Sequence, residues 1–142
     1  MQWENEQKKN YLRQYIVLSR KEQELEGEIE ALRQKYIGRA ITYSNTPKGS
    51  GNGSDLSDYA AQVDGLLDKL MRRQREAVQA YREIEEKIEQ LGDEREKEVL
   101  RLRYLRNLPW EEIAKAIGYE LTNTYHIHGL ALQHFPLILK SS

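Results

Sequence analysis

Polar side chains gather on one side of a helix predicted over residues 121–135, namely Thr122, Asn123, Tyr125, His126 and Gly129. The Asn123 amide carries a donor and an acceptor in one plane, and these match the major-groove edge of adenine. Tyr125 and His126 can contact a phosphate or a thymine methyl group, and Gly129 leaves room for a close approach. This set can therefore recognise base edges, provided that the helix presents this side to solvent.

Three histidines lie in the same helix, at His126, His128 and His134. Their spacings of two, six and eight positions lack the i, i+4 pair with which one helix face binds a metal. No cysteine or nearby acidic side chain completes a set of four ligands. We expect no metal site and no cofactor, and we expect His128 to pack at the edge of its domain. Protonation of clustered histidines adds positive charge, so DNA binding should strengthen as the pH falls toward about 6.

Catalytic signatures are not found in the sequence. Acidic residues lie on predicted helix faces, where pairing with Lys or Arg four positions away is the ordinary arrangement. Serines cluster in a predicted linker and in the C-terminal tail. No nucleophile elbow, glycine-rich phosphate cradle or HExxH motif occurs. We therefore expect that the protein is not an enzyme.

Three short helices predicted over residues 93–136 position the polar set. Asp93 can cap the first helix, and Pro109 ends it and suits the first turn of the second. Gly118 ends the second helix because glycine readily adopts a left-handed conformation. Two short helices joined by a glycine turn behind a supporting helix are typical of a helix-turn-helix. The buried side of the third helix is predicted to hold Thr124, Ile127, Ala131 and Phe135.

The segment RLRYLRNLPWEEIAKAIGY, residues 101–119, resembles region 4 of the sigma-70 factors. It looks most like small phage-encoded regulators that carry a sigma-region-4-like C-terminus behind a helical hairpin. The segment YHIHG at residues 125–129 also matches that group. The resemblance is specific over roughly the last 45 residues and extends to the layout of the first 92. It implies binding to double-stranded DNA and transcriptional control.

Four cations near the third helix are candidates for phosphate contacts, namely Arg101, Arg103, Arg106 and Lys115. The sequence departs from the family pattern in Glu120, where a serine cap is usual, and in His126 and Leu130, where arginine is usual. No Lys or Arg occurs between Lys115 and Lys140. A DNA-facing helix without a cation loses part of the counterion release that dominates affinity. Contact with DNA, contact with protein only, and neither therefore all stay open.

Composition suits extended charged helices. Of the 142 residues, 32% are charged and 39% hydrophobic, and 22 Lys and Arg against 23 Asp and Glu leave a net charge of −1. Any nucleic-acid footprint must therefore be local. There is no cysteine, and no apolar run nears the ~20 residues that cross a membrane. The N-terminal sequence lacks the apolar core of a signal peptide, so we expect a cytoplasmic protein without a membrane partner.

Heptad spacing predicts two long helices, over residues 1–37 and 55–92, that fold back as an antiparallel hairpin. The expected fold is thus all-α, with a coiled-coil-like hairpin followed by the helix-turn-helix and a tail at 137–142. In the second helix, one heptad position holds Val63, Leu70, Ala77 and Ile84. The other is predicted at Ala60, Leu67, Gln74 and Tyr81. The hairpin seam is predicted to contain Tyr15, Leu18, Leu25, Ile29, Leu32, Val63, Leu67, Leu70 and Ile84.

Between the two helices, residues 38–54 are rich in glycine and polar residues. Such a composition predicts a flexible loop. Glu22 interrupts the first seam, and it is expected either to meet Gln74 or an arginine near it or to turn to solvent. A polar seam residue of this kind can set helix register at a cost in stability.

Further apolar residues flank the seams, namely Leu12, Ile16, Val17, Tyr59, Leu66 and Val78. They widen the apolar surface beyond what one partner helix covers, so we expect a homodimer or higher oligomer with a four-helix core. The alternative is that they pack on the C-terminal domain. The expected function is a phage or prophage transcriptional regulator that binds DNA. A DNA-packaging subunit and a protein-only adaptor of RNA polymerase are the alternatives.

Overall fold

The computed structural model describes residues 2–44 and 52–137, and it describes side chains for residues 2–38 and 55–137. Every regular element in these ranges is a helix, which confirms the expected all-α class. The chain forms two compact units. We call Met1–Val17 with Ala77–Ser142 the head, and Leu18–Glu76 the stalk. No helix in the described ranges combines the length and the apolar character needed to span a membrane.

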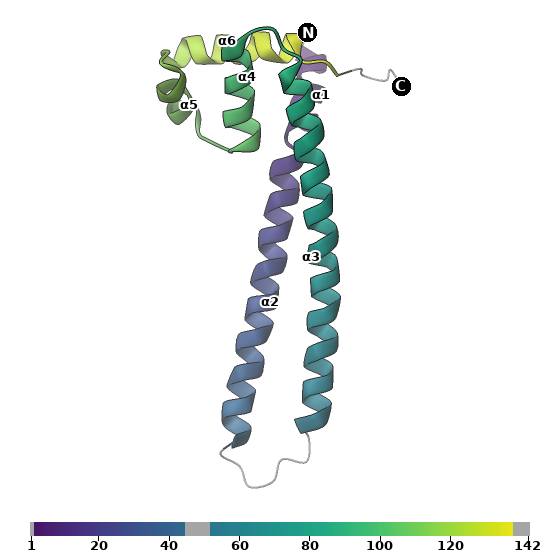
Figure 1. Cartoon of the computed structure of the whole chain (residues 1–142). Coiled ribbons are helices and arrows are strands. Elements are labelled where there is room, and N and C mark those ends of the chain that lie inside the picture. Colours follow the sequence, from purple (N-terminus) through teal and green to yellow (C-terminus); the bar gives the residue numbers. More distant parts are fainter. Residues whose placement is uncertain (1, 45–51, 138–142) are drawn as a thin grey trace. The chain divides into compact units, whose positions relative to one another are not determined.

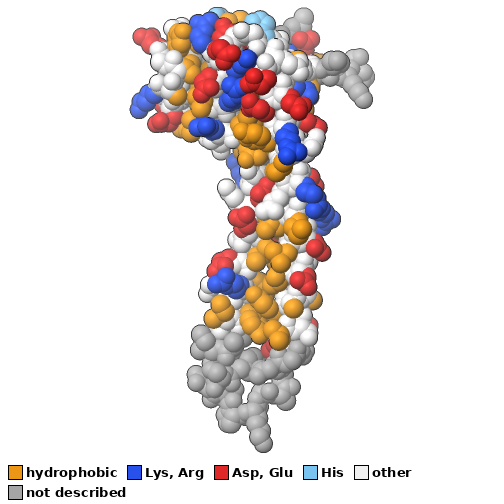
Figure 2. Space-filling model, in the orientation of Figure 1, with side chains coloured by type: hydrophobic (Ala, Val, Ile, Leu, Met, Phe, Trp, Pro, Cys, Tyr) orange, Lys and Arg blue, Asp and Glu red, His pale blue; other side chains and the backbone are white. Residues whose placement is uncertain are grey.

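Two long helices build the stalk, α2 (Gln14–Ser44) and α3 (Asn52–Glu89). They lie side by side (Figure 1), and the rings of Tyr36 and Tyr59 stack with centroids 4.2 Å apart. In α2 the expected seam residues Leu18, Leu25, Ile29 and Leu32 are half-buried. Figure 2 shows hydrophobic side chains gathered along the stalk between charged ones.

Part of the predicted seam in α3 is wrong, although Tyr81 does meet α2, where its ring lies edge-on to that of Tyr15 with centroids 5.2 Å apart. Leu67 was expected to face α2, but its side chain is 40% exposed, and Leu66 is half-buried in its place. The correct positions follow 3-and-4 spacing through Tyr59, Val63, Leu66, Leu70, Arg73, Ala77 and Ala80, all half-buried or buried. Leu66 and Leu67 are both leucines about 100° apart around the helix, so the sequence admits two seams. The prediction combined one position from each.

The predicted flexible loop over residues 38–54 is also too long. The backbone stays helical from Gly38 to Ser44, and α3 already begins at Asn52. A glycine within a helix costs only about 1 kcal/mol relative to alanine, which does not suffice to end a helix at Gly38. Residues 45–51 lie outside the described ranges.

Among the described side chains, Glu22 bonds neither to Gln74 nor to an arginine near it. Arg73 Nη1 instead lies 3.2 Å from a Glu76 carboxylate oxygen. Glu22 is half-buried in the seam, and desolvation together with the nearby charge of Glu26 raises the pKa of its carboxyl group. The Glu22 carboxylate therefore opposes pairing of the two helices, because the seam removes part of its charge from water and offers it no bonded partner in the part of the chain that the structure describes.

The head is built from both ends of the chain. Its helices are α1 (Gln2–Leu12), α4 (Glu94–Leu100), α5 (Trp110–Ile117) and α6 (Leu121–His134), together with the last turns of α3. Leu12 of α1 is fully buried, in one cluster with Ile84 and Ile88 of α3, Leu100 of α4, Leu132 of α6, and Phe135 directly after α6. The predicted domain at 93–136 is therefore completed by residues from outside it, because α1 and α3 supply part of its core.

A π-helical turn joins α4 to the loop before α5. It spans Arg101–Leu105, and the Arg106 amide donates to the Arg101 carbonyl over 3.0 Å. This wider turn directs Leu102, Tyr104 and Leu105 into the core together. The chain then turns at Asn107, whose φ of 56° is left-handed, a conformation that asparagine tolerates better than most residues.

Candidate nucleic-acid interface

The predicted polar set lies on the outer side of α6. Thr122, Asn123, Tyr125 and His126 are exposed and Gly129 is half-exposed. On the opposite side Thr124, Ile127, Ala131 and Phe135 are buried, so the division of this helix into an inner and an outer face is confirmed. A Cβ added at Gly129 would meet no atom within 4 Å, which shows that packing within the chain does not require glycine there.

Local geometry brings α6 to the surface in a fixed orientation. Gly118 ends α5 in the left-handed conformation, with φ of 76°, and its amide donates to the Ala114 carbonyl over 3.0 Å. Helix α6 begins three residues later, at Leu121, and the Thr124 hydroxyl donates to the Glu120 carbonyl over 2.9 Å. Glu120 makes no side-chain cap, so Thr124 supplies the only side-chain hydrogen bond described in this first turn.

A buried lysine holds the other end of α6. The Lys8 ammonium group donates to the Leu132 carbonyl at 2.8 Å and to the Gln133 carbonyl at 3.1 Å. The carbonyls in the last turn of a helix have no partners within it, and they carry the negative end of the helix dipole. Lys8 therefore fixes the C-terminal end of α6 against α1. Sequence reasoning missed this residue because nothing local marks a contact across the whole chain.

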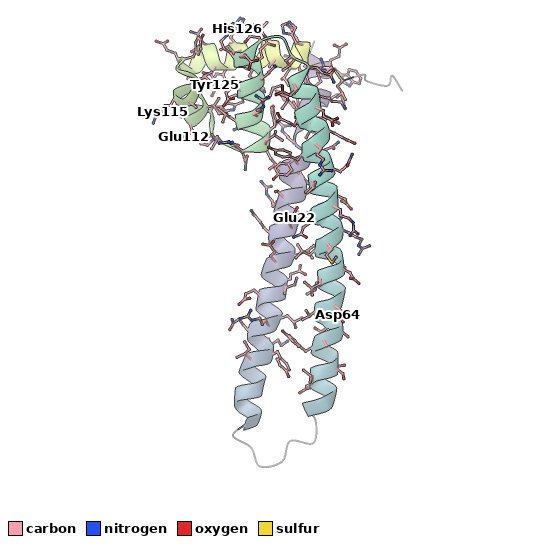
Figure 3. All side chains as sticks on the ribbon, in the orientation of Figure 1. Glu22, Asp64, Glu112, Lys115, Tyr125 and His126 are labelled. Carbon is pink, nitrogen blue, oxygen red and sulfur yellow. The ribbon has the colours of Figure 1, made fainter. Side chains whose placement is uncertain are left out.

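An aromatic cluster supports one edge of the polar row. Trp110 lies edge-on to Tyr125, with ring centroids 5.2 Å apart, and the Arg103 guanidinium stacks over Trp110 at 4.5 Å. Figure 3 shows Tyr125 and His126 leaving α6 on different sides. Tyr125 thus leans toward α5, and the side chains that stand clear on the outer row are Thr122, Asn123 and His126.

His128 belongs to the core of the head. Its Nε2 lies 2.8 Å from the hydroxyl of Tyr104, and both side chains are buried. Burial lowers the pKa of His128 to about 4, with further contributions from the charges of Lys9, Arg103 and Arg13. Burial likewise raises the pKa of Tyr104 to about 12. His128 therefore stays neutral at pH 6 and cannot contribute to the predicted charging of a histidine cluster.

His134 is also occupied within the head. Its Nδ1 lies 2.7 Å from a carboxylate oxygen of Glu96, a residue that is only 5% exposed. Asp93 caps α4 as predicted, accepting from the Arg95 amide at 2.7 Å and the Glu96 amide at 3.3 Å. The Glu96 side chain bonds to His134 of α6, so it does not reach back to the start of α4 to form a capping box with Asp93. Of the three histidines, only His126 stands free on the outer face of α6.

Two of the four arginines and lysines predicted to contact phosphates already have partners within the head. The Arg101 guanidinium pairs with Glu85 at 2.9 Å and also with Glu89, so two carboxylates already neutralise it. Arg103 stacks on Trp110 and donates to the Leu108 carbonyl at 3.1 Å. The acidic partners of Arg101 come from α3, so its ion pairs could not be predicted from the local segment. The partners of Arg103, by contrast, lie within seven residues of it in the sequence.

Arg106 and Lys115 differ from these two arginines. Both side chains are exposed, and among the described residues neither makes an ion pair. Figure 3 shows Lys115 on α5, with Glu112 on the same helix. The accessible positive charge beside α6 is thus small, and the exposed carboxylates of Glu111 and Glu112 oppose it.

The edge between α4 and α6 is closed by a further arginine. Arg95 pairs with Asp93 at 3.0 Å and donates to the Tyr119 hydroxyl at 3.3 Å. The hydrogen bonds from Arg95 hold the pKa of Asp93 at about 2. Both contacts hold Arg95 against the segments that precede α4 and α6.

Comparison with models of known protein families, with curated proteins and with solved structures finds no match for this chain.

Proposed function

We propose that the protein is a non-catalytic, cytoplasmic DNA-binding regulator of transcription, encoded by a phage or prophage, that uses α6 to read bases. The observation that carries the proposal is the outer row of α6, where Thr122, Asn123 and His126 are exposed beside the open position of Gly129. A recognition helix needs such a row near its N-terminus, on a helix that follows a tight turn. Gly118 supplies that turn.

Rigid support of α6 favours this use. Lys8 fixes the C-terminal end, Thr124 the first turn, and the buried pair of Tyr104 and His128 the middle of the helix. A reading helix must hold its side chains in a defined geometry, because base-specific hydrogen bonds depend strongly on direction. The charge around α6 predicts moderate affinity, since few phosphates can be neutralised.

The test begins with selection of DNA sites from a random pool, with the purified protein alone and with RNA polymerase present. Asn123→Ala should then weaken binding to the selected site by ~1–3 kcal/mol and relax the preference at one base position. Gln133→Ala is the matched control, because Gln133 is an exposed amide near the opposite end of the same helix. Equal affinities for the parent and the Asn123 variant would refute base reading by α6.

A protein-only adaptor is the second candidate, and the neutralised arginines favour it. Arg95 and Arg101 are paired with carboxylates, whereas Tyr119, Leu121 and Tyr125 expose 36–46% of their surfaces beside α6. Such apolar and aromatic exposure suits contact with another protein. Capture of RNA polymerase by the head, without any shift of selected or random DNA, would support this candidate over the first.

A further inference from the structure

The stalk lacks a buried interior within the described part of the chain. None of the described side chains from Leu18 to Glu76 is buried; the seam residues between α2 and α3 are half-buried. Helices of this length derive most of their stability from packing an apolar face. A half-buried seam therefore indicates that the stalk packs against something else.

A second stripe runs along α3 beside the seam that faces α2. Each member follows a seam residue by one position, and all are exposed: Ala60, Asp64, Leu67, Met71, Gln74, Val78 and Tyr81. Four of them are large apolar residues that expose 40% (Leu67), 52% (Met71), 50% (Val78) and 41% (Tyr81) of their surfaces. The stripe has the 4-and-3 spacing of a coiled-coil contact.

The two stripes of α3 are directed about 100° apart, because successive residues differ by that angle around a helix. A helix in a four-helix bundle contacts two neighbours at nearly this angle. The exposed faces of α2, by contrast, carry mostly charged side chains such as Glu24, Glu28 and Glu30. Helix α3 therefore offers the better surface for a second partner.

The head sets where the stripe ends. Glu85, the next member of the series, binds Arg101 at 2.9 Å, and the ring of Tyr81 lies edge-on to that of Tyr15 of α2 with centroids 5.2 Å apart. The accessible part therefore runs from Ala60 to Val78, and its midpoint is Lys69. A symmetric partner that uses this whole accessible part must cross a two-fold axis near Lys69.

Antiparallel pairing about Lys69 matches the residues of the stripe with one another. It places Leu67 against Met71 of the second copy, and Ala60 against Val78. It also places Asp64 level with Gln74 and Arg75 of the second copy, where a carboxylate finds an amide and a guanidinium. Parallel pairing instead places Asp64 against Asp64 in the core of the contact, where like charges repel each other.

The charges of α3 favour the same direction. Residues 55–68 contain Asp55, Asp58, Asp64 and Asp68 and no Lys or Arg, whereas residues 69–75 contain Lys69, Arg72, Arg73 and Arg75 and no acid. Antiparallel pairing about Lys69 sets the acidic block of one helix beside the basic block of the other. Parallel pairing sets each block beside its own kind.

We propose that a second copy of this chain packs along the Ala60–Val78 part of the α3 stripe in the antiparallel direction. The two-fold axis lies near Lys69, and Asp64 pairs with Gln74 and Arg75 across the contact. This pairing gives a surface and a direction to the homodimer that the apolar residues beside the seams predict. It rests on α3 alone and holds whether or not α6 binds DNA, so its test uses no DNA.

The first measurement is the mass of the full chain in solution at micromolar concentration. We expect twice the 16.7 kDa of one chain. Leu67→Glu should weaken dimerisation by ~100-fold or more, because it buries an unpaired charge twice in the contact. Gln62→Glu is the control, since Gln62 is exposed on α3 outside both stripes, and it should leave the mass unchanged. A monomeric parent chain, or a larger closed oligomer, would overturn the proposal.

The direction of pairing is measured from the distance between two spin labels, one on each copy, attached to a single introduced cysteine. Labelling is specific because the sequence contains no native cysteine. Asp58→Cys and Arg72→Cys place the label at the same heptad position, two repeats apart. In the antiparallel dimer the two labels at residue 58 lie ~33 Å apart along the axis, and those at residue 72 only ~9 Å. Equal distances at the two positions would show a parallel pair and overturn the proposal.

A charge exchange tests the named contact. Asp64→Arg and Arg75→Asp should each weaken dimerisation roughly tenfold, because each sets like charges opposite one another. The double variant should recover to within about threefold of the parent, since the pair is restored in reverse. Circular dichroism on each variant verifies that helix content is retained. Failure of the double variant to recover, with helix content intact, would refute the pairing of Asp64 with Arg75.

Discussion

Acid should destabilise the head through His128, and the size of this effect follows from its burial. The imidazole has an ordinary pKa of 6.5, and burial beside Tyr104 lowers it to about 4 in the folded chain. Between about pH 4 and pH 6.5, His128 is therefore mostly protonated in the unfolded chain and mostly neutral in the folded chain. Stability then rises with pH in the window between about 4 and 6.5, and this contribution is fully present above that window.

The magnitude at pH 5 is about 2 kcal/mol. It comes from the difference in protonation between a group with a pKa of 6.5 and one with a pKa of about 4, at 1.36 kcal/mol for each pH unit. His128 is only 8% exposed, so solvent screens little of this effect. A loss of this size is a large part of the stability of a small domain.

The assay compares urea unfolding at pH 8 and pH 5 for the parent and for His128→Gln. A Trp3→Phe background leaves Trp110 as the single tryptophan reporter, with its ring centroid 4.7 Å from that of His128. Glutamine can still bond to the Tyr104 hydroxyl but does not titrate. We expect the variant to lose about 2 kcal/mol less than the parent between the two pH values.

Direct titration of the imidazole by nuclear magnetic resonance separates this cause from other groups. Resonances of His128 should move with a midpoint about 2 or more pH units below those of an unstructured peptide. A midpoint near the ordinary value of 6.5 would refute the reasoning, as would an equal loss of stability on acidification in parent and variant. The pair of Tyr104 and His128 would then be open to water.

Three further expectations concern charge and packing in the head. Arg106→Ala and Lys115→Ala should each reduce the slope of log affinity for DNA against log salt by ~0.9, measured by fluorescence anisotropy; an unchanged slope would exclude that residue from phosphate contact. Lys8→Met should lower the free energy of unfolding, measured with urea, by ~1.5–3 kcal/mol, because the last carbonyls of α6 lose a charged donor. Its control is Lys9→Met, which removes only the pair with the exposed Glu6 and should change the free energy of unfolding by less than ~0.5 kcal/mol. Gly129→Ala should raise the free energy of unfolding by ~1 kcal/mol and weaken DNA binding; tighter binding would argue against an interface there.

Local patterns predicted α6 well. The inner positions of Thr124, Ile127 and Ala131 recur with the helical period, and burial follows that period. Gly118 and Asp93 were identified because each acts within a few residues of its own position. Such features depend on backbone conformation and nearest neighbours, which the order of the residues directly encodes.

Contacts across the chain were not predictable in the same way. Lys8 reaches α6, Glu85 reaches Arg101, and Glu96 reaches His134, yet each looks like an ordinary charged residue on a helix face. Their roles appear only when distant segments are brought together. In α3, two adjacent apolar stripes satisfied the same periodicity, so the spacing could not decide whether Leu66 or Leu67 faced α2.

Because Leu12 is fully buried among residues of α3, α4 and α6, the segment over residues 93–136 shares its core with α1 and cannot be separated from it without exposing that core. During synthesis, Leu12 and Lys8 reach their final positions only after α6, more than a hundred residues further along the chain, has been made. A gene exchange that carried only the C-terminal fifty or so codons into another protein would deliver a fragment with an open core. The resulting hybrid protein would need other side chains to fill the space that Leu12 of α1 occupies here.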